Sequence, residues 1–130
     1  MTPAELKTMR ESLGLPVQWL AERANVQRRT VEYWEAGRSK VPNDVSDLLL
    51  QIDTQFAEAT RQALAAVDEQ TAVQGHPPET VRLYRYRDDA ELWQARPDMR
   101  GLPATAHAAL LARVRSALLV RGQAVAIEYA

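Results

Sequence analysis

The chain has 130 residues, which is the size of one ordinary domain or of a small domain with an appended unit. Apolar residues make up 46%, so a largely disordered chain is excluded, and the absence of cysteine excludes disulfides, thiolate catalysis and Cys-based zinc sites. The net charge is −1, but residues 1–41 hold seven basic and five acidic side chains, whereas residues 42–130 hold nine and twelve. The basic end is therefore the part expected to face phosphate groups.

The first 37 residues predict three short helices. Thr2-Pro3-Ala4-Glu5 is a helix start, because Thr caps, Pro suits the first helical position and Glu completes a capping box, while Gly14 is the stop. A second helix begins near Pro16, and Asn25-Val26-Gln27 forms a tight turn. A third helix runs from about Arg28 to Ala36 and ends at a glycine.

A longer fourth helix opens at Pro42-Asn43-Asp44 and ends before the linker Gly75-His76-Pro77-Pro78. Beyond the linker we predict a strand, a short helix, a longer helix and a final strand, at Thr80–Tyr86, Asp88–Ala95, Thr105–Arg121 and Ala124–Tyr129. The predicted fold is mainly α with a small α+β C-terminal part, and its domains are residues 1–73 and 80–130. Two strands need the long helix or a second copy to cover them.

The stretch from Leu15 to Gly37 resembles the helix-turn-helix of lambda-repressor-like (XRE-type) regulators. Ala21 matches the small residue where the two helices approach closely, and Val26 matches the apolar plug of the turn. Val31 matches the buried face of the recognition helix, and Trp34-Glu35-Ala36-Gly37 matches its exit. The resemblance implies a sequence-specific DNA-binding transcriptional regulator.

The exposed N-terminal half of the third helix is the part that a helix-turn-helix inserts into the major groove. Arg can pair bidentately with guanine and Gln with adenine, and the methyl group of Thr can touch thymine. Arg38 and Lys40 follow the helix and could hold phosphates, although a solvated surface is nearly as good an interpretation. The predicted DNA-binding residues are Gln18, Gln27, Arg28, Arg29, Thr30, Glu32, Tyr33, Arg38 and Lys40.

Two positions differ from the relatives. Val17 stands where many of them have a glutamine that grips a phosphate, so Gln18 or backbone N–H groups would have to replace it. Trp19 stands where a polar residue is usual, and it either packs on the C-terminal unit, which we favour, or lies against the sugar-phosphate backbone. Arg10 and Glu35 match a structural ion pair of the relatives and are assigned to folding.

The layout as a whole resembles YdiL-like proteins and the anti-CRISPR-associated (Aca-type) autorepressors of phages. This resemblance implies a homodimer, joined through the C-terminal unit, that binds double-stranded DNA at a palindromic operator in its own promoter. The residues give a second reason for a dimer. One small unit cannot cover all the apolar side chains of its two strands, which are Val81, Leu83, Val125 and Ile127.

Other classes of protein fit less well. An enzyme lacks support, because His76 lies in the linker and His107 is expected on a helix surface, with no cluster that could hold a metal or form a nucleophile. No cofactor and no membrane span are expected, and the protein is predicted to be cytoplasmic. An antitoxin whose tail binds a toxin is the main alternative. RNA could also meet the basic strand, although charge protection of a strand edge is favoured, at Arg82, Tyr84, Arg85, Tyr86 and Arg87.

Overall fold

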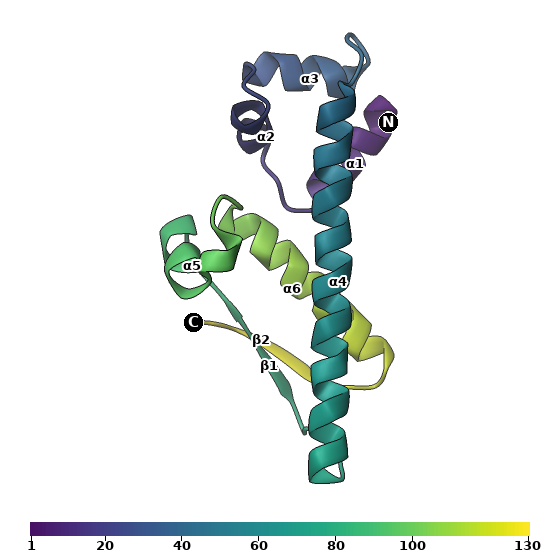
Figure 1. Cartoon of the computed structure of the whole chain (residues 1–130), viewed down its shortest axis with the longest axis vertical. Coiled ribbons are helices and arrows are strands. Elements are labelled where there is room, and N and C mark those ends of the chain that lie inside the picture. Colours follow the sequence, from purple (N-terminus) through teal and green to yellow (C-terminus); the bar gives the residue numbers. More distant parts are fainter. The chain divides into compact units, whose positions relative to one another are not determined.

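The computed structural model describes all 130 residues (Figure 1). Two compact units divide the chain at residues 54 and 55, within the long helix α4 (Asn43–Gln74), which contributes to both. The predicted domains at 1–73 and 80–130 follow the end of that helix instead, and they stay a prediction. No helix is both long and apolar enough to cross a lipid bilayer.

Unit 1 contains three short helices followed by the start of α4 (Figure 1). They are α1 (Pro3–Ser12), α2 (Val17–Arg23) and α3 (Arg28–Ala36). Thr2 Oγ1 accepts a hydrogen bond from the Glu5 N–H at 3.1 Å, which confirms the predicted start of α1. The corner between α2 and α3 turns at Asn25, whose φ of 57° is left-handed and suits an asparagine.

The core of unit 1 is built from one face of each of its helices. Leu6, Leu20 and Leu49 have no exposed surface, and Val31 and Trp34 turn the inner side of α3 toward them. Burial of such side chains is the main favourable term in folding, at about 1.5–3 kcal/mol each. The buried face of α3 is thus the one predicted, and the opposite face is left for other contacts.

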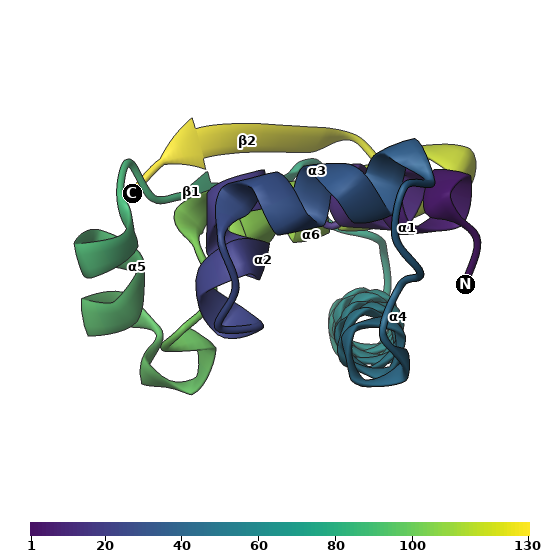
Figure 2. The same ribbon diagram turned by 90° about the horizontal axis from the view of Figure 1, so that it is seen from above.

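Unit 2 contains a two-stranded parallel sheet of β1 (Val81–Arg85) and β2 (Val125–Tyr129). Parallel strands cannot be joined by a tight turn, so a long connection carries α5 (Asp89–Ala95), a 3₁₀ turn η1 (Pro97–Met99) and α6 (Ala104–Val120). Helix α6 packs on the sheet, as Figure 2 shows. The predicted strands and helices are confirmed, and the fold is mainly helical with six α-helices and a small C-terminal sheet.

His107 is not on a helix surface, as the sequence led us to expect, but is only 3% exposed. It lies on the buried stripe of α6 with Leu110, Leu111 and Val114, and its ring centroid is 5.3 Å from that of Tyr86. The spacing of three, four and seven residues was the available signal. Burial lowers the pKa of His107, and the nearby Arg96 guanidinium lowers it further.

The buried His107 should make the protein less stable in acid. Its pKa is lowered in the folded state, so the unfolded chain binds the proton more readily. Stability is therefore expected to fall as the pH drops below the unfolded value of about 6.5, with a slope of at most about 1.4 kcal/mol per pH unit from this group. Urea unfolding between pH 5 and pH 8 measures the slope. His107→Leu should flatten it, and an unchanged slope would assign the effect to other groups.

Candidate nucleic-acid interface

A buried ion pair fixes α3 against the rest of unit 1. Arg10 Nε donates to Glu35 Oε2 at 2.7 Å and Arg10 Nη2 donates to Glu35 Oε1 at 3.0 Å, while Nη1 reaches the Leu15 carbonyl at 2.9 Å. Both charged side chains are only 9% exposed. Bidentate pairs of this kind set orientation as well as distance. The structural ion pair expected from the resemblance is confirmed, and it connects α1 and the loop before α2 to α3.

The N-terminal turn of α3 carries positive charge at the positive end of the helix. Gln27 is the N-cap residue, but its side chain accepts no capping hydrogen bond, and the first turn has no acidic residue. Arg28 and Arg29 stand there instead, both exposed. Cations at a helix N-terminus oppose the helix dipole, so this end of α3 is electrostatically suited to an external anion.

The C-terminal end of α3 turns back on itself at Gly37. Its φ of 78° is left-handed, which glycine adopts without strain, and it lets the Arg38 N–H donate to the Tyr33 carbonyl at 2.9 Å. The Arg38 guanidinium carbon then lies 5.4 Å from the centre of the Tyr33 ring. The turn thus brings Arg38 over the last turn of α3, while Lys40 is exposed just beyond.

All nine predicted DNA-binding residues lie in unit 1. Eight of them belong to α3, its N-cap and the turn that follows, and Gln18 lies on α2. Arg28 Nε donates to Glu32 Oε1 at 3.0 Å, and Gln18 Nε2 donates to Glu22 Oε1 at 3.1 Å. Thr30 is half-buried and so has less side chain to offer. Their contact with DNA stays a prediction.

Residues 4–70 match the family model described as a helix-turn-helix domain. The chain belongs to the helix-turn-helix family. It is also 36% identical over 90 residues to the Aca2 repressor of Pectobacterium phage ZF40, an alignment that covers 68% of this chain and 72% of that protein. This helix-turn-helix protein is thus a DNA-binding protein and not an enzyme. The resemblances to helix-turn-helix regulators and to Aca-type repressors are confirmed, and the likeness to YdiL-like proteins stays a prediction.

One basic side chain of the helix-turn-helix is absent from the predicted set. Arg23 at the end of α2 lies with its guanidinium carbon 5.7 Å from the centre of the Trp19 ring. Trp19 is half-buried, and Arg23 is exposed. The four-residue spacing on one helix was the signal that could have paired them. Both interpretations of Trp19, packing on the C-terminal unit and contact with the DNA backbone, remain untested.

Two basic side chains of β1 and the residues after it, those of Arg82 and Arg87, have partners within unit 2 itself. Arg82 pairs with Glu128 across the sheet, and the Arg87 guanidinium carbon lies 4.0 Å from the centre of the Tyr129 ring. Cross-strand pairs and stacked guanidinium groups of this kind stabilise a small sheet. The observation supports charge protection of the strand edge over an RNA-binding surface.

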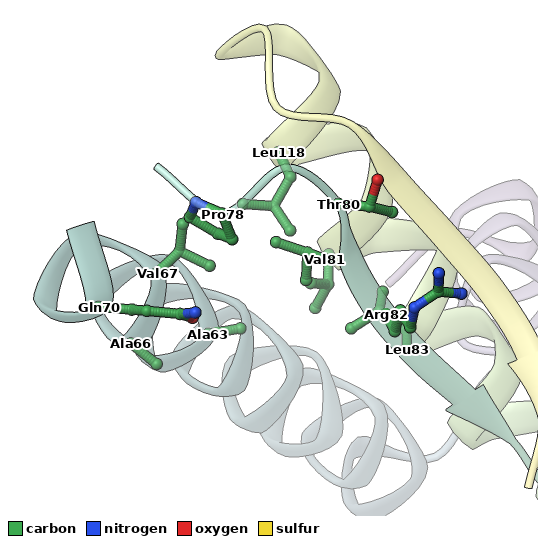
Figure 3. A pocket seen from close by; sticks show the side chains of 11 residues that line it. Ala63, Ala66, Val67, Gln70, Pro78, Thr80, Val81, Arg82, Leu83 and Leu118 are labelled. Atoms are coloured by element: carbon green, nitrogen blue, oxygen red, sulfur yellow. The ribbon is translucent and has the colours of Figure 1, made fainter. Parts of the chain in front are cut away.

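The apolar face of the sheet in unit 2 is incompletely covered. A cavity of about 350 Å³ lies between β1, α6 and residues 63–70 of α4, and Figure 3 shows Val67, Val81 and Leu118 turned toward it. Val81 and Leu83 are only half-buried, and Ile127 and Tyr129 on β2 are 40% and 57% exposed. Protein interiors are normally close-packed, so unit 2 has apolar surface that its own side chains do not cover.

Proposed function

We propose that this helix-turn-helix protein is a homodimeric transcriptional repressor that binds an inverted-repeat operator, with α3 in the major groove. The observation that carries the proposal is the uncapped, doubly basic start of α3, held on a frame fixed by the Arg10–Glu35 pair. The relationship to the Aca2 repressor supports repression as the outcome of binding. The resemblance of the layout to Aca-type autorepressors further supports a position of the proposed operator in the promoter of the protein's own gene.

The residues divide into two kinds of contact. Arg28, Arg29 and Gln27 stand at the start of α3, where a recognition helix meets base edges, and they suit guanine and adenine. Arg38 and Lys40 stand at the other end, where they suit phosphates and add affinity without choosing a sequence. This division predicts that specificity and general affinity can be changed separately.

The homodimer is proposed to form through residues 80–130. A single copy leaves Ile127 and Tyr129 of β2 exposed, and Ile127 is paired in register with Leu83, which lines the cavity. A second copy would bury this apolar surface. A palindromic operator requires the same two-fold symmetry of the protein. The dimer therefore accounts for the incomplete packing of the C-terminal unit and for the symmetry of the proposed site.

Light scattering tests the dimer. The full chain at micromolar concentration is expected to have twice the mass of one chain, and Ile127→Asp is expected to shift it to the monomer because it places a charge in the contact. Leu50→Asp is the matched control, since Leu50 is 48% exposed but lies outside residues 80–130. A wild-type monomer would contradict the dimer, and a stable complex with a second, small protein would support the antitoxin alternative.

Selection of bound fragments from a random DNA pool tests the operator. We expect an inverted repeat whose half-site centres lie about 10–10.5 base pairs apart or a multiple of that distance. The recovered sequence should also occur upstream of the protein's own gene. Failure to enrich any sequence would contradict specific DNA recognition, whereas enrichment of a single half-site would contradict the symmetric dimer alone.

A further inference from the structure

We propose that Glu32 is a positioning residue that orients Arg28 to read a guanine, so that the two adjacent arginines of α3 have different roles. The inference rests on the proposed function and goes beyond it, because it assigns sequence choice to one of two equivalent-looking side chains. Its starting observation is the hydrogen bond from Arg28 Nε to Glu32 Oε1, at 3.0 Å on the exposed face of α3.

Glu32 accepts its hydrogen bond from Nε of Arg28, which leaves the edge of the guanidinium group that can contact a base available. A guanidinium group has three nitrogens, and Glu32 takes Nε, whereas Nη1 and Nη2 of Arg28 form no hydrogen bond within the protein. Nη1 and Nη2 together make the end-on edge that can donate two parallel hydrogen bonds to O6 and N7 of guanine. A bond from Glu32 to this edge would have blocked that pairing.

Arg29 has no comparable support. The residue four positions further on is Tyr33, which lies beneath Arg38 and carries no carboxylate. Arg29 is exposed and forms no ion pair in the structure. An unsupported side chain must lose more conformational freedom on binding, which lowers its contribution to a directional contact. Arg29 is therefore suited to a phosphate or to a contact that varies with sequence.

A carboxylate on this face needs a reason, because it repels the DNA phosphates. Glu32 could itself accept a hydrogen bond from cytosine N4, which is the direct alternative. The two roles differ in whether the effect of Glu32 on DNA binding depends on Arg28. A positioning residue no longer favours binding once Arg28 is gone, so its removal then only relieves the repulsion, whereas a residue that contacts cytosine still favours binding.

A double-mutant cycle on the full-length protein and the selected operator separates them. Arg28→Ala is expected to weaken operator binding about 5- to 150-fold. Glu32→Gln is expected to weaken it about 2- to 10-fold, as ordering of one long side chain is lost, and to cause no further weakening when it is combined with Arg28→Ala. Glu58→Gln is the matched control, because Glu58 pairs with Arg61 on the exposed face of α4 and should have no effect.

Operators with 7-deazaguanine identify the base that is read, since this analogue lacks the N7 acceptor. At one guanine the analogue should weaken binding by the wild type and not by Arg28→Ala, and Glu32→Gln should show a reduced penalty. Independent, additive effects of the two substitutions would overturn the positioning role and assign Glu32 to DNA. Absence of any selected operator would instead contradict the proposed function, so the two failures are distinguishable.

Discussion

Replacing Arg10 with methionine is expected to destabilise the helix-turn-helix by about 3–5 kcal/mol, because removing one partner leaves a buried charge uncompensated. Glu35 is 9% exposed and would lose both of its hydrogen bonds from Arg10, and the Leu15 carbonyl would lose its donor. Urea unfolding followed by tryptophan fluorescence measures the effect, since Trp34 is packed in the same core. DNA binding should weaken in step with the fraction unfolded.

A second substitution distinguishes a buried charge from lost packing. Arg10→Met combined with Glu35→Leu should recover most of the stability, since apolar side chains of similar volume can replace a buried ion pair. Arg61→Ala removes a pair of α4 that is largely exposed, and it should leave the unfolding transition where it is. If Arg10→Met were as harmless as Arg61→Ala, the pair would have no structural role.

The helix-turn-helix could be predicted closely because its boundaries depend on local chemistry. Thr2 caps the N-terminus of α1, and Asn25 and Gly37 adopt the left-handed conformation that their turns require. Apolar spacing then identified the buried side of α3, with Val31 and Trp34. The Arg10–Glu35 pair joins distant residues, and only the family resemblance indicated it.

The C-terminal unit was predicted in its elements but not in their assembly. Alternation identified β1 and β2, yet their parallel pairing depends on how the long connection crosses the sheet. The depth of His107 in the core depends on what covers α6, which no single-residue pattern shows. On α3, the spacing of Arg28 and Glu32 permitted a contact, but the choice of Nε depends on side-chain rotamers.

Changing both Arg28 and Arg29 to lysine is expected to reduce the preference for the operator over unrelated DNA while leaving general affinity almost unchanged. Lysine keeps the charge that meets phosphate but lacks the planar fork that pairs with guanine. Each lost bidentate contact is worth about 1–3 kcal/mol of discrimination, so the pair should lose about 2–6 kcal/mol if both read bases, and about half of that if only Arg28 does. Both side chains are exposed, and the fold should be unaffected.

The comparison that decides this prediction uses two DNAs at one salt concentration. Affinities for the operator and for a scrambled sequence give the specificity ratio directly. Arg38→Ala with Lys40→Ala is the converse control, since loss of phosphate contacts should weaken both DNAs alike and reduce the salt slope by about one for each contact. An unchanged specificity ratio in the double lysine variant would show that the arginines in the first turn of α3 do not recognise the base sequence. A fallen ratio with unchanged salt slope would assign base recognition to that turn and leave affinity to the turn after Gly37.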